Sequence, residues 1–246
     1  MKINKKLLIP KIFFMILFAC LFIILSKVKL TPIFGTDTSF SASVFFGPII
    51  ARLIGIPFGV GAIFLAHIVG WALNLYTIKS TVNLFVFFPI LFGGIYFARM
   101  FKGDKRLIAL PLVCMVAFIL HPIGRTVWYY SLFWLIPISI AKFKNKIDKI
   151  LRKEIFRIYS YSLGTAFVDH SVGSVIYLYF MKIPAKFWIM AMPFTIVERL
   201  IIAGGITFTY LAMRKPLEIM QKAFITKAIA ISKKQSQKEE VPIIHA

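Results

Sequence analysis

The chain has 246 residues, of which 59% are hydrophobic and 16% charged, and its formal net charge is +21. A soluble domain carries roughly 25% charged residues, so this composition excludes an ordinary soluble protein. Apolar residues form blocks without the alternation of a membrane barrel, and several blocks reach the roughly 20 residues that a membrane-spanning helix needs. Lys and Arg gather between the blocks, which is typical of cytoplasmic loops and not of a nucleic-acid surface. We therefore predict an all-α polytopic protein of the cell membrane, with no nucleic-acid partner.

The apolar blocks follow one another with short interruptions. We expect the first to stay as an uncleaved helix, because its apolar run continues past Cys20 and no small-residue cleavage site follows. A polar loop, TPIFGTDTS, comes next, and the sequences GIP and HPIGR each split one later region into two pieces. The predicted segments are Leu7–Ser26, Phe40–Leu53, Pro57–Ile78, Val82–Met100, Leu107–Leu120, Thr126–Ala141, Ile155–Met181 and Phe187–Met213.

Basic clusters predict the orientation of these segments. They flank the first helix, occupy Arg99–Arg106 and Lys142–Lys153, and begin again at Arg214. Placing every cluster in the cytoplasm requires an even number of crossings between clusters, which eight spans provide. The shortness of two segments instead favours six spans, with each broken pair forming one span and a re-entrant half. Both interpretations put the termini inside, and TPIFGTDTS and the later turn KIPAK outside.

The composition changes near residue 216. We predict a transmembrane helical domain over residues 1–215 and a basic cytoplasmic tail over 216–246. Apolar residues recur at helical spacing from Leu217 to Ala228, which indicates either a short amphipathic helix on the inner leaflet or a frayed basic tail. The segment SKKQSQKEE has the composition of a disordered chain.

Four ionisable residues, Asp169, His170, Glu198 and Arg199, interrupt the last two apolar segments. Asp169 lies fifteen positions before Pro184 in the turn KIPAK, and Glu198 lies fourteen after it. Antiparallel helices rising 1.5 Å per residue therefore bring all four to one depth, roughly 20 Å from the turn. A charge at the centre of a span costs roughly 2.5–3.5 kcal/mol, so we expect Arg199 to pair with one carboxylate and His170 with the other. The group is either an ionic lock between helices or the polar floor of a substrate or ion cavity.

Two further sets of residues are candidates for binding a solute. His67, Trp71 and Asn74 are spaced four and three apart, so they share one face of a predicted helix. An imidazole and an amide beside an indole suit a small polar or heterocyclic ligand, although an interfacial Trp and a packed His are equally ordinary. Asp37 lies in the outer loop TPIFGTDTS and is a candidate for the mouth of a site.

Two stretches carry a resemblance to a known family. Residues 39–70, SFSASVFFGPIIARLIGIPFGVGAIFLAHIVG, contain an FGP turn within a broken helical pair. Residues 164–215 contain the pattern P-x-x-x-x-E-R, a glycine pair and a basic end. In these stretches the chain resembles the substrate-capture (S) components of energy-coupling-factor (ECF) vitamin transporters.

The resemblance implies a compact bundle of about six helices that binds a vitamin near the outer face. It also implies a separate membrane coupling subunit and ATPase subunits as partners, with TPIFGTDTS and Asp37 as a lid. Asp169, His170 and Glu198 then lie under or beside the pocket. No phosphate loop, HExxH or GxSxG motif occurs, so we expect neither an enzyme nor a cofactor or metal site.

We therefore expect a solute-binding importer subunit whose cavity lies between the broken pair at 40–78 and the last hairpin. Two other hypotheses stay open. One is an autonomous proton-coupled transporter in which Asp169 or Glu198 titrates. The other is an intramembrane enzyme that uses His67 or His170.

Overall fold

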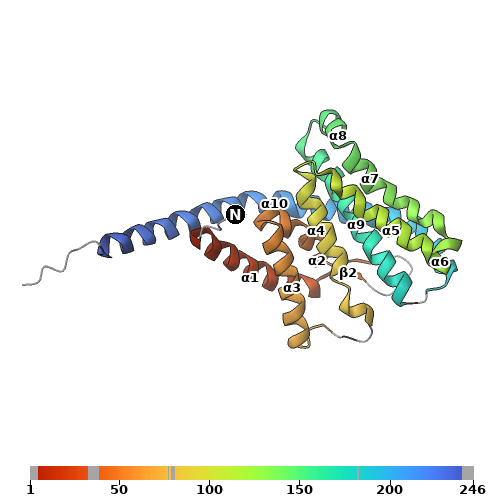
Figure 1. The fold of residues 1–246 in the computed structure, drawn as a ribbon, viewed down its shortest axis with the longest axis horizontal. Helices are drawn as coiled ribbons and strands as arrows, with labels where there is room; N and C mark the ends of the chain where they lie inside the picture. The colour runs from red at the N-terminus through yellow and green to blue at the C-terminus, as the bar shows by residue number, and fades with distance from the viewer. Residues whose placement is uncertain (1–4, 33–38, 77, 79–80, 182, 240–246) are drawn as a thin grey trace, which may run out of the picture.

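The protein is almost entirely helical, as the computed structural model in Figure 1 shows. The structure describes residues 5–32, 39–76, 78, 81–181 and 183–239. These residues confirm the all-α class, since one short two-stranded hairpin is the only sheet among them. Three stretches are long and apolar enough to cross a membrane, namely Leu8–Lys27, Thr81–Met100 and Ala185–Phe224.

The described part of the chain folds into ten α-helices, three short 3₁₀ helices and two strands. In chain order they are α1 (Lys5–Lys27), β1 (Lys29–Pro32), β2 (Ser39–Ser41), α2 (Ser43–Ile54), α3 (Ile56–Ala72), η1 (Thr81–Leu84), α4 (Phe88–Met100), η2 (Lys105–Ile108), α5 (Ala109–Leu120), α6 (Pro122–Thr126), η3 (Trp128–Trp134), α7 (Leu135–Lys142), α8 (Lys144–Ile150), α9 (Glu154–Phe180) and α10 (Ala185–Glu239).

The predicted broken pair forms a tight helical hairpin, α2 and α3. Gly55 separates the helices with a φ of +94°, a conformation that glycine adopts without strain. Four residues later, Gly59 lets the second helix lie directly on the first, because a Cβ there would be 2.4 Å from the Cα of Ala51. This region therefore forms two short apolar helices that pack on each other.

The last two helices, α9 and α10, pack antiparallel in the predicted register. Glu154 pairs with Arg214 through both guanidinium nitrogens, the hydroxyls of Ser162 and Thr207 are 2.9 Å apart, and Asp169 pairs with Arg199. Residue numbers rise along α9 as the partner numbers fall along α10, so residues equidistant from the KIPAK turn share a depth. This confirms the geometry on which the expected charge cluster depends.

The segment after HPIGR departs from a plain helix. The aromatic run WYYSLFW forms η3, and only its continuation Leu135–Lys142 forms the regular helix α7. Trp134 and Phe118 are fully buried in an aromatic cluster against α9. Tyr96 of α4 donates a 2.7 Å hydrogen bond to the carbonyl of Pro137, which ties α7 to the centre of the bundle.

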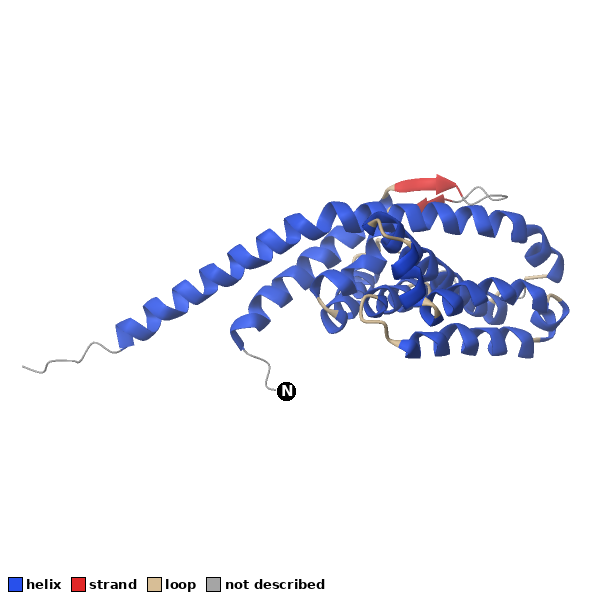
Figure 2. Ribbon diagram, turned by 90° about the horizontal axis from the view of Figure 1, so that it is seen from above, coloured by secondary structure: helices blue, strands red, loops and turns tan. Residues whose placement is uncertain are grey.

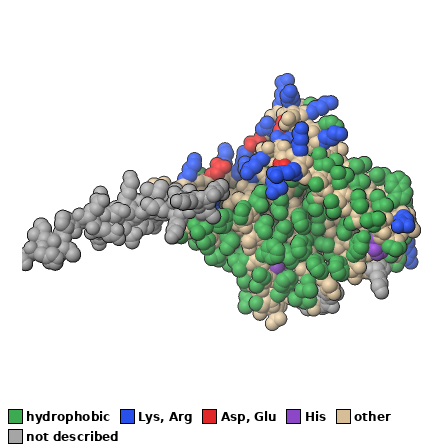
Figure 3. Space-filling view, in the orientation of Figure 1, with side chains coloured by type: hydrophobic (Ala, Val, Ile, Leu, Met, Phe, Trp, Pro, Cys, Tyr) green, Lys and Arg blue, Asp and Glu red, His purple; other side chains and the backbone are tan. Residues whose placement is uncertain are grey.

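Basic side chains collect at one end of the molecule. Figure 3 shows Lys and Arg above a largely hydrophobic face, over α8 and the neighbouring turns. The clusters 99–106 and 142–153 meet there, since the aliphatic part of Lys144 lies beside Gly103. Asp104 in this region accepts hydrogen bonds from the backbone and guanidinium of Arg106, which lowers its pKa to about 2.

The tail differs from the prediction. Helix α10 continues without a break through Pro216 to Glu239, so SKKQSQKE is helical and the boundary at residue 215 is not a break in structure. Figures 1 and 2 show the extension leaving the bundle beside α1. Leu217 is buried, and the ring of Phe224 stacks on Phe13 of α1 at 5.2 Å. The start of the predicted tail is therefore packed onto the membrane domain.

Candidate functional site

A cavity of about 380 Å³ lies near the strand hairpin, between α1, α2, α3 and α4. The antiparallel strands β1 and β2 pair Lys29 with Ser41 and Pro32 with Ser39, and they return the chain to the start of α2. Ser41 and Ser43 line one wall, and their hydroxyls are 2.7 Å apart. The opposite wall comes from the end of α3, which carries His67 and Trp71.

His67 and Trp71 share a helix face as predicted, and both line the cavity. The Nδ1 of His67 is 2.9 Å from the carbonyl oxygen of Ile63, to which it donates a hydrogen bond. Nδ1 therefore carries a proton, and in the neutral form of the ring Nε2 is a hydrogen-bond acceptor. The imidazole packs at 5.9 Å from Trp71, 5.4 Å from Tyr76 and 5.1 Å from Phe87. One wall is thus an aromatic surface around one nitrogen acceptor.

Asn74 does not belong to this wall, so its predicted place beside His67 and Trp71 is wrong. Helix α3 ends at Ala72, and Asn74 follows with a φ of +53°, in the left-handed conformation that asparagine tolerates. Its side chain is exposed and outside the cavity lining. Because α3 ends before Asn74, this side chain does not lie on the helix face that carries His67 and Trp71.

The cavity has polar lining residues that the sequence did not single out. Tyr76 donates a 3.0 Å hydrogen bond to Ser26 of α1, and its ring rests against Gly70, where a Cβ would be 2.3 Å from the ring. Asn83 of η1 brings an amide to the cavity. Only the Ser-rich sequence SFSAS, which covers β2 and the first residue of α2, offered a local signal. Tyr76 and Asn83 reach the site through the turn between α3 and α4.

The buried charges lie outside the cavity lining. Arg199 Nη1 is 3.6 Å from Asp169 Oδ2, and Arg199 Nη2 is 3.4 Å from Glu198 Oε2. Arg199 therefore pairs with both carboxylates, whereas pairing with only one of them was predicted. Arg199 is only 5% exposed, and the ring of Phe40 in β2 covers its guanidinium at 5.1 Å. Gly93 of α4 faces Asp169, and a Cβ at this position would be in ordinary van der Waals contact with the Cβ of Asp169, at 3.5 Å.

This ion pair is incompletely satisfied. Within the described residues, Asp169 Oδ1 and Arg199 Nε are buried and have no hydrogen-bond partner. The distance of 3.6 Å between the charged atoms also exceeds that of a strong charge-assisted hydrogen bond. A buried pair of this kind is weak evidence for stability alone, because desolvation offsets much of the attraction.

His170 has a different environment from the expected one. Trp134 Nε1 donates to His170 Nδ1 at 3.2 Å, and the Tyr130 hydroxyl lies 2.9 Å from His170 Nε2. Because Nδ1 accepts, the neutral ring carries its proton on Nε2 and donates it to Tyr130. The expected bond of His170 to a carboxylate is absent among the described residues. The imidazole instead belongs to the aromatic cluster of Phe118, Tyr130 and Trp134.

The cavity is not where the sequence placed it. Its lining comes from α1, β2, α2, α3, η1 and α4, and none of its lining residues belongs to α9 or α10. Asp169, His170, Glu198 and Arg199 therefore lie beside the cavity and not in its wall. Strand β2 connects the two regions, since Ser41 lines the cavity and the adjacent Phe40 covers Arg199. Asp37 lies outside the described residues.

No group of three or more His, Cys, Asp or Glu side chains that could hold a metal ion occurs in the parts of the chain that the structure describes. The chemistry of the cavity is that of hydroxyls, one imidazole nitrogen, an amide and aromatic rings. Such a surface binds a small neutral or weakly polar molecule through hydrogen bonds and stacking.

Comparisons with known proteins give one similar sequence. The chain is 25% identical over 222 residues to an uncharacterised protein of Methanocaldococcus jannaschii, an alignment that covers 87% of this chain and 72% of that protein. No family model matches the chain, and no solved structure matches it.

Proposed function

We propose that this chain is the solute-binding membrane subunit of an importer of the ECF type, and that its solute occupies the cavity at His67 and Trp71. The cavity carries the proposal. Its volume of about 380 Å³ falls in the range of small-molecule sites, and it combines aromatic walls with a few convergent polar groups. A flat heterocycle of vitamin size stacks on Trp71 or Tyr76 and donates a hydrogen bond to His67 Nε2.

The proposal includes a membrane topology. Eight passes, from α1 to α10, place the basic end of the molecule in the cytoplasm and the β1–β2 hairpin outside. In this orientation both termini are cytoplasmic and the cavity opens toward the outer face. A membrane coupling subunit and ATPase subunits then supply the energy for uptake.

The experiment compares two tryptophan variants. The protein is purified in detergent, its bound small molecules are identified by mass spectrometry, and the affinity of the recovered compound is measured. Trp71→Ala weakens binding by roughly tenfold or more, because a stacking contact is worth on the order of 1 kcal/mol beyond the area that it buries. Trp128→Ala is the matched control, since Trp128 is 51% exposed and outside the cavity lining. Equal binding by both variants would place the solute elsewhere.

A second candidate function is an autonomous proton-coupled transporter. The unpartnered Asp169 Oδ1 and Arg199 Nε favour it, because an incompletely satisfied buried pair is suited to rearrange. Proteoliposomes that contain only this chain separate the two functions. Uptake of the solute driven by an imposed proton gradient, and lost in Asp169→Asn, supports the second function. Uptake that requires added coupling and ATPase subunits supports the first.

A further inference from the structure

A second depression lies at the basic end of the molecule, away from the proposed solute cavity. It is a groove of about 450 Å³ between α7, α8 and α9. Its lining is nearly all aliphatic, with Leu135, Ile136, Ile140, Ile147, Leu151 and Leu163. The solute-binding proposal leaves this groove without a role.

A cation lies one helical turn from the groove lining on α7 and another on α9. Ser139 lines the groove from α7, and Lys142 follows it by three positions, so the two share a helix face one turn apart. Ser160 lines it from α9, and Arg157 precedes it by three positions in the same way. Helical spacing therefore directs both cations toward the same end of an aliphatic slot.

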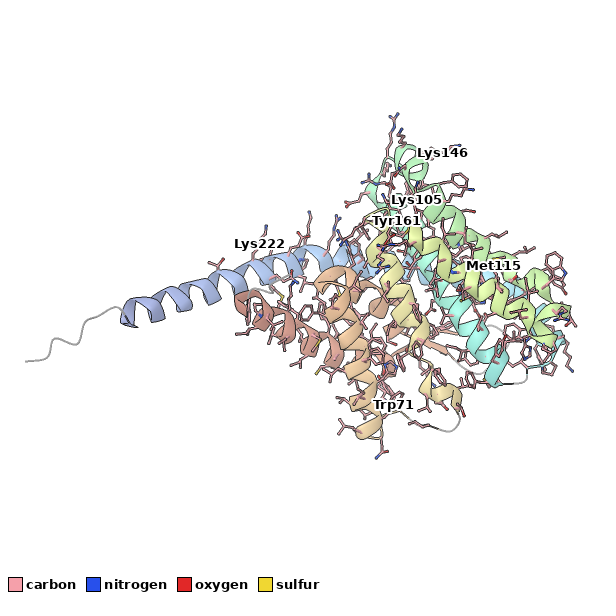
Figure 4. The ribbon with its side chains drawn as sticks, in the orientation of Figure 1. Trp71, Lys105, Met115, Lys146, Tyr161 and Lys222 are labelled. Atoms are coloured by element: carbon pink, nitrogen blue, oxygen red, sulfur yellow. The ribbon has the colours of Figure 1, made fainter. Side chains whose placement is uncertain are left out.

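The two nearby acids are hydrogen-bonded to other residues, although Arg157 interacts electrostatically with both of them. Asp148 is already engaged by Lys144 at 2.5 Å and by the hydroxyl of Tyr161, and Glu154 is engaged by Arg214. Six cations of this segment take part in no ion pair among the described residues: Lys142, Lys146, Lys149, Arg152, Lys153 and Arg157. Figure 4 shows Lys146 reaching outward at this end of the molecule.

We propose that the groove is a binding site for one anionic phospholipid of the membrane leaflet at the basic end. An acyl chain lies along the aliphatic lining, and the phosphate is held by Lys142 and Arg157. The charge complementarity selects this occupant, because an apolar slot that ends in a segment with seven cations and two acids (residues 142–157) matches a lipid with an anionic headgroup. A neutral lipid fills the slot equally well but gains nothing from the cations.

The test is native mass spectrometry of the full chain, released from nanodiscs that contain equal amounts of phosphatidylglycerol and phosphatidylcholine. The wild type retains phosphatidylglycerol in preference to phosphatidylcholine. In the double variant Lys142→Gln with Arg157→Gln, the preference for phosphatidylglycerol over phosphatidylcholine is about 30-fold lower than in the wild type. This factor follows from roughly 1 kcal/mol for each basic residue near an anionic surface. Ser139→Trp fills the slot and lowers retention of both lipids.

The control removes the same charge elsewhere. Lys11 lies on α1 and Lys222 on the extension of α10, and Figure 4 shows Lys222 on a different part of the molecule from Lys146 of α8. Lys11→Gln with Lys222→Gln keeps the wild-type preference within about twofold. The proposal is overturned if this control loses as much preference as the groove variant, which indicates diffuse attraction. It is also overturned if soluble glycerol phosphate displaces the lipid completely, which shows that the slot contributes nothing.

Discussion

Replacing Arg199 with Met tests whether one guanidinium balances both buried carboxylates. Arg199 contacts Asp169 at 3.6 Å and Glu198 at 3.4 Å, and their side chains are 14% and 10% exposed. Removing one partner of a buried ion pair costs about 3–5 kcal/mol, because the remaining charge loses its compensation. We therefore expect Arg199→Met to lower the thermal midpoint by about 6–20 °C, using about 2–4 °C per kcal/mol for a chain of this length.

Asp169→Asn is the informative comparison. It removes one carboxylate of the two, leaves Arg199 beside Glu198, and replaces a contact that is too long for a strong hydrogen bond. We expect a loss of about 1 kcal/mol or less, and a midpoint within about 4 °C of the wild type. The double variant Arg199→Met with Asp169→Asn should be more stable than Arg199→Met alone. The effects of substitutions at residues in contact are not additive, and the second substitution removes a carboxylate that the first left unpaired.

The assay is thermal unfolding in detergent, followed by tryptophan fluorescence and by loss of monodisperse protein. Two results would refute the reasoning. Equal losses for Arg199→Met and Asp169→Asn mean that Asp169 alone balances the guanidinium. A loss below about 1 kcal/mol for Arg199→Met means that water reaches the carboxylates, which favours a hydrated ion pathway over a dry lock.

Two other predictions test local features. Gly59→Ala should destabilise the protein by about 1–3 kcal/mol, because its Cβ would lie 2.4 Å from the Cα of Ala51, whereas Gly204→Ala meets nothing within 4 Å and should melt like the wild type. Hydrogen bonds from Arg106 lower the pKa of Asp104 to about 2, so the stabilisation from this carboxylate is complete above its unfolded pKa near 3.9 and is lost as the pH falls through about 2. A carbon-13 NMR titration of labelled aspartate should show this pKa, and Arg106→Gln should return it toward 3.9; an unchanged pKa in that variant would contradict the assignment.

The contact between α9 and α10 could be predicted because residues equally distant from the KIPAK turn lie at the same depth. The counting from Pro184 needs only two antiparallel helices of constant rise, and the observed pair of Asp169 with Arg199 satisfies it. The same approach fails for His170. Adjacent helical residues point about 100° apart, so Asp169 and His170 cannot face the same neighbour. One turns toward α10 and the other toward η3, where Trp134 and Tyr130 bind it.

The position of the cavity could not be predicted from short-range sequence patterns. Helical spacing correctly placed His67 and Trp71 on one face, but it could not indicate that α3 ends before Asn74. Tyr76 follows the end of α3 and Asn83 belongs to η1, so neither lies on the helix face that carries His67 and Trp71. Spacing rules apply within one element, so they predict one wall of a site and not the elements that close it.

Strand β2 shows why the two regions belong together in one mechanism. Successive residues of a strand point to opposite faces, so Ser41 lines the cavity while Phe40 covers Arg199. A movement of this strand that widens the cavity also withdraws an aromatic ring from a buried guanidinium whose Nε has no partner among the described residues. Water that enters behind Phe40 can then satisfy Arg199 and Asp169. Such a movement of β2 would couple access to the cavity to the hydration of the ion pair, although Asp169 and Arg199 are not among the residues that line the cavity.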